Sequence, residues 1–341
     1  MTTDILNILG KLEKKPQRKL NDHVLIVDSM NMFIRNFVML QSINPQGHHT
    51  GGLVGFLRSL GYLTRTFDPT RVICVFDGQG SSMNRKNINP EYKAQRVNKR
   101  ISNWDMFDNK EDEFASMTMQ MHRLVEYLQC LPITLMSIDK VEADDVISFL
   151  AQGFGSKGHR VTIVSSDKDF LQVVDDHVEV YSPIKKKLYK KRDVFEELGM
   201  IPENYLILKA LLGDNSDNLT GVKGLGIKTV LKEFPGIVSD PNFSLGSVFN
   251  ICEENLKTKK IFANILYEWN KVETNYELMN LLEPRLSDQE ILYILEKIKQ
   301  PITSLQVQPF LRMLEIDKIE ALNKNVEGWL EVFRPLSTYQ K

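Results

Sequence analysis

The stretches HVLIVDS (residues 23–29) and RVICVFDG (residues 71–78) decide the fold, because each is an unbroken apolar run that reaches an aspartate. Strands of a parallel sheet are buried on both faces and read as continuous Val/Ile/Leu runs. Open parallel sheets place their chemistry in the crevice at the carboxyl ends of the strands. We therefore expect Asp28 and Asp77 to lie at the same edge of one sheet.

Seven further acidic residues stand where a predicted strand ends or a helix begins, in VEADDVI (141–147), SSDKD (165–169) and GDNSDN (213–218). A single acid in such a place is usually a helix N-cap, but several in one crevice would repel one another without cations. Oxygen ligands with no Cys or His nearby favour Mg²⁺ or Mn²⁺ over zinc. The predicted metal ligands are Asp28, Asp77, Glu142, Asp144, Asp145, Asp167, Asp169, Asp214 and Asp217.

The first two hundred residues alternate between short apolar runs and segments with helical periodicity, such as residues 50–67 and 114–131. This alternation predicts an α/β fold, with a mostly parallel central sheet flanked by helices. Beyond Ile201 the periodicity is predominantly helical. The predicted regions are an N-terminal arm (1–21), an α/β core (22–200), a helix-hairpin-helix element (201–240) and a mainly helical C-terminal region (241–341).

The composition excludes several classes of protein. The 341 residues carry a net charge of −1 and three scattered cysteines without a CxxC pair, which is typical of a reducing compartment. The apolar stretches are too short to span a membrane. Near the N-terminus the basic residues follow the apolar patch, the reverse of a secretory signal. We therefore expect a cytoplasmic protein without a membrane partner.

The small net charge hides two basic runs, at residues 85–100 and 185–192. The first lies in a polar insertion from about Gln79 to Glu113 in which periodicity disappears; a stretch of that length is usually functional or mobile. A charge run is most often a solvated face. Beside an acidic metal centre, however, Lys and Arg would also hold the phosphates of a polyanion.

The segment GVKGLGIKT (221–229) predicts a glycine-containing hairpin between two helices. Gly221, Gly224 and Gly226 would let the backbone approach a phosphate, and Lys228 would add a cation. The segment is not a P-loop, because Ile227 separates the last glycine from the lysine and no strand precedes it. The acidic segments also lack the glycine and closing glutamate of an EF-hand loop.

Taken in order, these motifs resemble the flap endonuclease/5′→3′ exonuclease superfamily. VDSMNMFIRNF, TGGLVGFLRSL, VFDG, PEYKAQR, VEADDVI, SSDKDF and GDNSDN with GVKGLGIKT follow the family order over about residues 22–240. The family includes the 5′-nuclease domain of bacterial DNA polymerase I, and phage-encoded flap nucleases with ribonuclease H activity are the most similar members. The resemblance implies a PIN-like nuclease core with a helical arch at about residues 79–113.

The resemblance also implies an activity: structure-specific 5′ cleavage that removes RNA primers or 5′ flaps during DNA replication. Two Mg²⁺ ions, with Mn²⁺ as a substitute, would support hydrolysis to a 5′-phosphate and a 3′-hydroxyl. In the family, the earlier carboxylates and Asp167 mostly hold the first ion, whereas Asp169, Asp214 and Asp217 bear more on the second. The implied catalytic residues are Asp28, Asp77, Asp144, Asp167, Lys93 and Arg96.

The expected nucleic-acid partner is double-stranded DNA or an RNA–DNA hybrid with a 5′ single-stranded end. Lys93 matches the arch lysine that contacts the scissile phosphate, and the family's hairpin also binds a K⁺ ion. The residues expected to bind nucleic acid are Arg85, Lys86, Tyr92, Lys93, Arg96, Lys209, Gly221, Gly224, Gly226 and Lys228.

Two other functions stay open. A PIN-type ribonuclease has a similar, smaller acidic crevice but usually lacks both the arch and the hairpin. A non-catalytic DNA-binding scaffold could keep the fold, although degenerate relatives typically lose carboxylates and all nine positions are filled here. A sliding clamp and a single-strand-binding protein are candidate partners, and a phage-encoded protein would work in the bacterial host cytoplasm.

Overall fold

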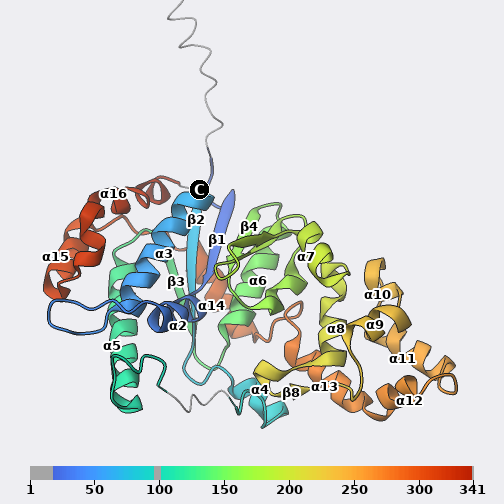
Figure 1. Cartoon of the computed structure of the whole chain (residues 1–341). Coiled ribbons are helices and arrows are strands. Elements are labelled where there is room, and N and C mark those ends of the chain that lie inside the picture. The colour runs from blue at the N-terminus through green and yellow to red at the C-terminus, as the bar shows by residue number, and fades with distance from the viewer. Residues whose placement is uncertain (1–17, 96–100, 340–341) are drawn as a thin grey trace, which may run out of the picture.

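A computed structural model describes residues 18–95 and 101–339, which form a six-stranded sheet with helices on both faces (Figure 1). The strand order is β3-β2-β1-β4-β5-β6, in which β1 to β5 run parallel and β6 pairs antiparallel with β5. The predicted mostly parallel α/β sheet is therefore confirmed. The strands are β1 (His23–Asp28), β2 (Arg71–Asp77), β3 (Thr134–Ile138), β4 (Arg160–Val164), β5 (Val178–Ser182) and β6 (Lys187–Tyr189).

The central strand β1 shows why its sequence is an unbroken apolar run. Val24 and Ile26 belong to one hydrophobic core, and Leu25 and Val27 belong to a second core. Consecutive side chains of a strand point to opposite faces of the sheet, so a strand covered on both faces must be apolar at every position.

The two cores are covered by different helices. One core is formed with α2 (Ser29–Met39), α3 (Gly51–Phe67) and α5 (Lys110–Gln129), on the left in Figure 1. The other is formed with α6 (Ala143–Gly155), α7 (Lys191–Leu198) and α8 (Tyr205–Leu212), on the right. Such layers on both faces leave the strand ends as the natural place for a site.

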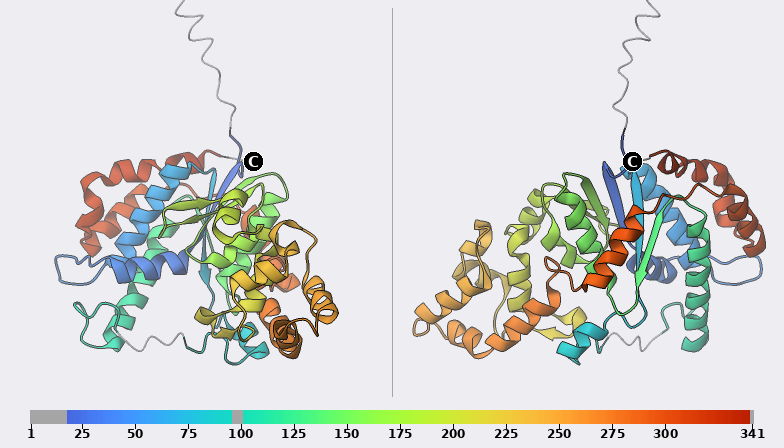
Figure 2. Two further views of the ribbon diagram at one scale, coloured as in Figure 1. Left: turned by 45° about the vertical axis from the view of Figure 1, so that its right-hand side comes forward. Right: turned by 180° about the vertical axis from the view of Figure 1, so that it is seen from behind.

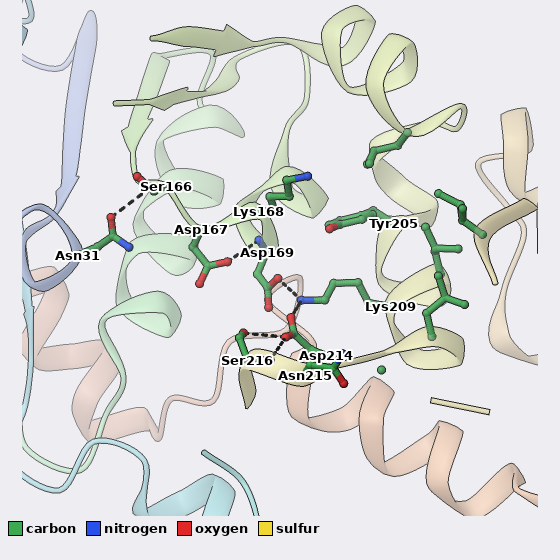
Figure 3. A pocket seen from close by; sticks show the side chains of 15 residues that line it. Asn31, Ser166, Asp167, Lys168, Asp169, Tyr205, Lys209, Asp214, Asn215 and Ser216 are labelled. Carbon is green, nitrogen blue, oxygen red and sulfur yellow. Dashed lines mark hydrogen bonds and ion pairs between the residues drawn. The ribbon is translucent and has the colours of Figure 1, made fainter. Parts of the chain in front are cut away.

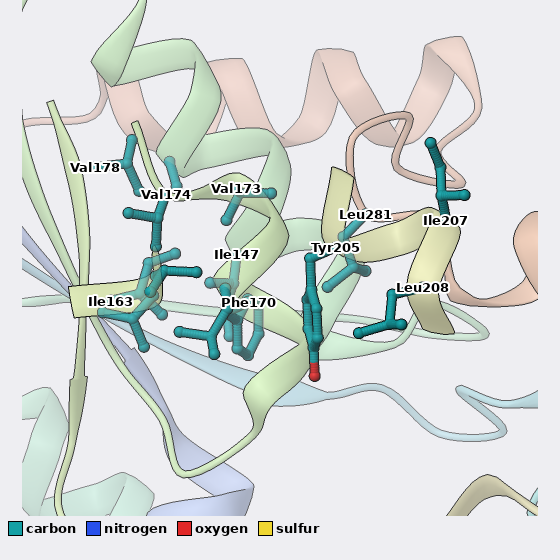
Figure 4. Packing of buried hydrophobic residues seen from close by; sticks show 14 of the residues in the cluster. Ile147, Ile163, Phe170, Val173, Val174, Val178, Tyr205, Ile207, Leu208 and Leu281 are labelled. Atoms are coloured by element: carbon teal, nitrogen blue, oxygen red, sulfur yellow. The ribbon is translucent and has the colours of Figure 1, made fainter. Parts of the chain in front are cut away.

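The second core continues from the sheet into the helices that carry later acidic motifs. Figure 4 shows Phe170 close to Ile163 of β4 and Ile147 of α6, with Tyr205 of α8 next to this group. Phe170 lies in η1, a 3₁₀ helix (Lys168–Val173). This buried packing holds in place the segment that carries Asp167, the N-cap of η1, and Asp169, in its first turn.

The insertion after β2 is partly helical. It contains the short helix α4 (Met83–Ile88), and its acidic end belongs to α5, which begins at Lys110 instead of Phe114. Asn109 caps α5 by accepting the N–H of Asp112, and acidic side chains in a first turn are favoured by the helix dipole. Residues 96–100, with the predicted Arg96, and residues 1–17 of the predicted arm lie outside the described residues.

The C-terminal hundred residues are helical, as predicted, and pack into both cores. Phe262, Val272 and Ile294 join one core, and Phe310 and Leu330 join the other. The predicted region boundaries stay predictions. The helices are α9 (Ile227–Glu233), α10 (Gly236–Ser239), α11 (Leu245–Glu254), α12 (Lys260–Tyr267), α13 (Trp269–Met279), α14 (Asp288–Lys299), α15 (Val307–Asp317) and α16 (Val326–Glu331).

Helix α14 packs against the edge strand β3. The right-hand view of Figure 2, which shows the molecule from behind, has this helix in front of the sheet. Beneath it the guanidinium of Arg71, a buried residue of β2, donates to the carbonyl of Ile298 at 3.0 Å. The C-terminal region therefore braces the sheet that carries the strand-end acids. Within residues 18–95 and 101–339, no helix has the length and apolar character that a membrane crossing requires.

Candidate active site

The carboxyl ends of β1 and β2 bring Asp28 and Asp77 together, as predicted from their motifs. Asp28 caps α2 by accepting the N–H of Asn31 at 3.1 Å, and it accepts the hydroxyl of Ser165 at 2.7 Å. Asp77 accepts the N–H of Ala143, the first residue of α6, at 3.0 Å. The backbone and a buried hydroxyl therefore orient both carboxylates.

The strand-end carboxylates lie so close together that they perturb one another. Burial, and then the charges of Asp77 and Asp167, raise the pKa of Asp28 to about 7. Burial, followed by Asp167 and Asp28, raises the pKa of Asp144 well above its usual range. We call Asp28, Asp77, Asp144 and Asp167 the crowded carboxylates, because such like charges in a low-dielectric crevice favour cation binding or protonation.

A second acidic pair adjoins the crowded carboxylates and contains a built-in cation. The ammonium of Lys209 donates to Asp169 and to Oδ2 of Asp214, the latter at 2.7 Å (Figure 3). Burial and Asp167 raise the pKa of Asp169 to about 7 despite Lys209. Burial also opposes ionisation of Asp214, but Lys209 and Ser216 outweigh it and lower the pKa to about 2.

Asp167 links the two groups. Its carboxylate accepts the N–H of Asp169 at 2.8 Å, and its own N–H donates to the hydroxyl of Ser165 at 3.0 Å. Ser165 therefore touches both Asp28 and Asp167. Neither Ser165 nor Asn31 was predicted as a site residue, although Ser165 stands two positions before Asp167 and Asn31 stands three after Asp28, where a cap partner is expected.

Glu142 and Asp145 are placed differently, because Arg85 pairs with both of them and Lys93 also pairs with Glu142. We call the segment from Arg85 to Lys93 the base of the arch. Arg85 donates to both oxygens of Asp145 at 2.5 and 3.0 Å, and its guanidinium lies 2.8 Å from Glu142. Asp145 also accepts the N–H of Arg285 at 3.0 Å. A bidentate guanidinium is the strongest partner that a side chain offers a carboxylate. Both predicted metal ligands are thus fully engaged by cations of the chain.

This arrangement corrects the prediction that Arg85 and Tyr92 contact phosphates. Both are buried, at 3% and 2% exposed. Arg85 also donates to the carbonyl of Leu278 at 2.9 Å, and the Tyr92 hydroxyl donates to Glu142 at 3.2 Å. Their polar atoms satisfy buried acids and a carbonyl, so neither faces solvent where a phosphate could bind.

Lys93 lies at the edge of the same network and stays partly accessible. Its side chain is 14% exposed, and its ammonium donates to Glu142 at 2.8 Å. Burial opposes its charge, yet Glu142, Asp144 and Asp217 raise its pKa. Its backbone has a left-handed φ of 56° and donates to the carbonyl of Asp217 at 2.9 Å. Asp217, predicted to bear on the second ion, therefore lies beside the base of the arch.

The helix-hairpin-helix element is formed by α8, a short pairing of β7 (Gly213–Asp214) with β8 (Leu219–Thr220), and α9. Gly224, with a φ of 80°, Gly226 and Lys228 are exposed, in keeping with a phosphate-binding hairpin. Gly221 serves packing instead, because a Cβ there would lie 2.1 Å from the carbonyl oxygen of Leu212.

Lys209 departs most from its prediction. The sequence placed it with the duplex-binding hairpin, but α8 turns its side chain into the acidic crevice. The crevice opens into a cavity of about 590 Å³, with Asp167, Asp169 and Asp214 on one side and Tyr205 on another (Figure 3). Ile227, the first residue of α9, also lines this cavity, which therefore connects the carboxylates with the hairpin.

The donor set fits a hard divalent cation, since every candidate ligand is a carboxylate, and burial with neighbouring carboxylates raises the pKa of Asp28 and Asp144. As the side chains lie, however, no group of three or more His, Cys, Asp or Glu residues in the described ranges is arranged to hold a metal ion. Glu142, Asp145 and Asp214 are instead paired with cations of the chain. The nine-ligand assignment therefore stays a prediction.

Comparison with known proteins gives a consistent result. Residues 23–199 match the family model of the 5′-3′ exonuclease N-terminal resolvase-like domain. A 5′-3′ exonuclease of Aquifex aeolicus is 31% identical over 304 residues, which cover 86% of this chain and 95% of the relative. A DNA polymerase I of Streptococcus pneumoniae is 30% identical over 256 residues, 71% of this chain but 26% of that protein.

Solved structures show the same fold. A bacteriophage T5 flap endonuclease, in a pseudo-enzyme–product complex with DNA and metal ions, superposes with a TM-score of 0.61 at 20% identity. The match covers 87% of this chain and 99% of that chain. A T5 5′-exonuclease with bound zinc gives a TM-score of 0.60 at 21% identity, over 86% and 99% of the two chains.

Proposed function

The chain belongs to the 5′-3′ exonuclease family, and from that premise we propose that it is a structure-specific 5′ nuclease whose phosphodiester hydrolysis depends on divalent cations. The observation that carries the proposal is the burial and crowding of carboxylates near the strand ends, which together raise the pKa of Asp28, Asp144 and Asp169. Such a crevice has a deficit of positive charge that divalent cations would fill, and the bound cations would in turn hold an anionic phosphodiester.

The residues divide into two candidate cation positions. The crowded carboxylates would hold one Mg²⁺ or Mn²⁺, and Asp169 with Asp214 would hold a second. When bound, such ions activate a water molecule and stabilise the leaving 3′ oxygen. The chain supplies orientation: Ser165 and Asn31 fix Asp28, and the first N–H of α6 fixes Asp77.

Lys93 would act on the substrate itself. Its ammonium sits on Glu142 at the base of the arch, partly open to solvent, where an arriving phosphate can compete for it. A fixed cation at this place neutralises charge that develops as the bond breaks. Lys86 is exposed on α4 and would contact the same strand, as would Arg96, which lies outside the described residues.

Recognition would follow the structure of the substrate and not its base sequence. The exposed hairpin around Gly224, Gly226 and Lys228 offers backbone and a cation to phosphates, which carry no base code. The proposed substrates are duplex DNA or RNA–DNA hybrids with a 5′ single-stranded end, including RNA primers and 5′ flaps. The products would carry a 5′-phosphate and a 3′-hydroxyl. Ribonuclease H activity, a K⁺ ion at the hairpin, and a clamp or single-strand-binding partner rest on the resemblance alone.

The test compares one labelled strand in three settings: a 5′ flap, a 3′ flap and a blunt duplex, each in Mg²⁺, in EDTA and after Mg²⁺ is restored. We expect Mg²⁺-dependent cleavage near the junction of the 5′ flap, with 5′-phosphate products, and the same with an RNA flap. Binding without cleavage in any divalent cation would favour the scaffold function. Cleavage of single-stranded RNA without a duplex requirement would favour a PIN-type ribonuclease.

A further inference from the structure

Lys209 occupies the place where the second divalent cation of the proposed mechanism would bind. It lies in the last turn of α8, and its side chain is 8% exposed. The ammonium bridges Asp169 and Asp214, as Figure 3 shows. The two acids come from η1 and β7, so three separate elements converge on one cation.

The surroundings of Asp214 show that this bridge is built into the fold. Its Oδ1 accepts both the N–H and the hydroxyl of Ser216 at 2.7 Å, and its Oδ2 accepts Lys209 at 2.7 Å. Each oxygen of Asp214 therefore has a partner. A divalent cation between Asp169 and Asp214 would share its place with the ammonium of Lys209, which repels it, so its binding is favoured when the ammonium moves away.

At Asp28, in the first cation position, the hydrogen-bond donors are neutral groups instead of an ammonium. That carboxylate accepts a hydroxyl from Ser165 and an N–H from Asn31, both neutral donors. Neutral donors orient a carboxylate but leave its negative charge in place, whereas an ammonium cancels it. Within one crevice, neutral donors thus orient Asp28, whereas Asp169 and Asp214 already share an ammonium.

We propose that Lys209 is an internal counter-ion that keeps a divalent cation out of the second position until a substrate phosphate takes over its ammonium. The inference rests on the proposed metal-dependent nuclease function and extends it. The adjoining cavity of about 590 Å³ gives a phosphate room beside the lysine. Because the phosphate frees Asp169 and Asp214, substrate and second cation strengthen each other's binding by the same factor.

The test is Ca²⁺ titration of the full chain by calorimetry, with and without a 5′-flap oligonucleotide, while a gel checks that the strand stays intact. In the wild type without nucleic acid we expect one stronger and one weaker Ca²⁺ site. Lys209→Met should tighten the weaker site by about tenfold or more, within the usual range of coupling between sites. The oligonucleotide should tighten that site in the wild type but not further in Lys209→Met.

Lys168→Met is the matched control, because it removes the same charge from the same cavity. Lys168 is 53% exposed and pairs with Glu197 at 3.3 Å instead of an active-site carboxylate. Its weaker Ca²⁺ site should stay within about twofold of the wild type. Equal tightening in both variants would mean general electrostatics and would overturn the proposal, as would no change in Lys209→Met.

Two further variants keep the result interpretable. Lys209→Arg retains the charge and should keep the second site weak. Lys209→Gln retains a hydrogen-bond donor without the charge; it replaces the methionine variant if that variant does not fold, and it should likewise tighten the site. A wild type that binds no divalent cation and cuts no 5′ flap would refute the proposed function itself. A wild type that cuts, with an unaltered second site in the uncharged variants, would refute only the role of Lys209.

Discussion

The crowded carboxylates and the paired acids Glu142, Asp145 and Asp214 lie in one acidic region yet have opposite surroundings. Arg85, Lys93 and Lys209 stand directly on the paired acids. At the crowded carboxylates, burial and mutual repulsion raise the pKa of Asp28 and Asp144. Where the fold supplies its own cation, an acid can serve as structure. Where burial and like charge raise the pKa instead, as at Asp28 and Asp144, the carboxyl group favours a cation from solution or a proton.

The largest effect should come from a crowded carboxylate. Asp144→Asn removes a charge that the cations need, so we expect Mg²⁺-dependent cleavage to fall more than about a hundredfold, beyond the usual loss for groups that merely orient ligands. Binding of the 5′-flap oligonucleotide should survive or tighten, because repulsion of the phosphates falls too. Single-turnover kinetics and anisotropy would measure the two effects. Asp288→Asn, at an exposed acid of α14, is the control, and near-normal turnover of Asp144→Asn would remove it from the site.

For Glu142 and Asp145, the two acids that pair with Arg85, loss of the partner should chiefly lower stability. Arg85→Leu leaves Asp145 and Glu142 buried without their guanidinium, and breaking such a buried pair costs about 3–5 kcal/mol. Denaturant unfolding would measure the loss. In the double variant Arg85→Leu with Asp145→Leu, the loss should be smaller than in Arg85→Leu alone, because an uncompensated charge is removed. If Arg85→Leu unfolds like the wild type, the contrast between the two groups of acids fails.

The pH dependence of stability should reveal the buried carboxylates of raised pKa, Asp28 and the neighbouring Asp169, when divalent cations are chelated. Asp28 and Asp169 have a folded pKa of about 7, above the ordinary 3.8 of an unfolded chain. Their protonated forms therefore favour folding at low pH, and stability is lost as the pH rises through about 7. Raising a pKa by one disfavours the charged form by about 1.4 kcal/mol, so the loss should reach a few kcal/mol.

Thermal melts from pH 5 to 8, with and without Mg²⁺, would check this dependence. Mg²⁺ should remove most of the decline, and Asp28→Asn should reduce it. Burial lowers the pKa of His23 to about 4, which acts in the opposite sense, since its stabilising contribution is lost as the pH falls below 6.5. The difference between the two curves isolates the carboxylates, because His23 is common to both. If the melting temperature depends on pH in the same way with and without Mg²⁺, the raised pKa values of these carboxylates do not contribute to stability.

The smallest effects should separate the base of the arch from the hairpin. Lys93→Ala should lower the single-turnover cleavage rate more than the affinity for duplex, because Lys93 lies by the acidic site. Lys228→Ala should weaken binding of all duplex sequences alike and reduce the slope of log affinity against log salt by about 1. Equal losses of affinity alone in both variants would contradict this division.

Much of the fold could be read from local patterns. Both faces of a central strand are buried and need apolar side chains. The sequences HVLIVDS and RVICVFDG are therefore unbroken apolar runs up to the aspartate. The acid that ends each run follows from the same geometry, because parallel strands share one carboxyl edge. The short motif around each aspartate therefore sufficed to predict that Asp28, Asp77, Asp144 and Asp167 lie at the same edge of the sheet.

The partners of the remaining acids could not be read in this way. Arg85 meets Asp145 across 60 positions of sequence, and Lys209 meets Asp169 across 40. In the sequence, Arg85 belongs to a basic run that looks like a solvated face, and Lys209 adjoins the hairpin motif. Leu278, whose carbonyl accepts from Arg85, lies beyond residues 22–240, over which the motifs follow the family order.

The sequence by itself therefore determined the sheet, the acidic edge and the glycine hairpin, because periodicity and turn chemistry act over a few neighbouring residues. Only the tertiary structure decided which acids are neutralised from within. A buried charge is tolerated only where a specific partner reaches it, and that depends on how distant elements pack. Helix α8 brings Lys209 to Asp214, and the base of the arch, held by the carbonyl of Leu278, brings Arg85 to Asp145.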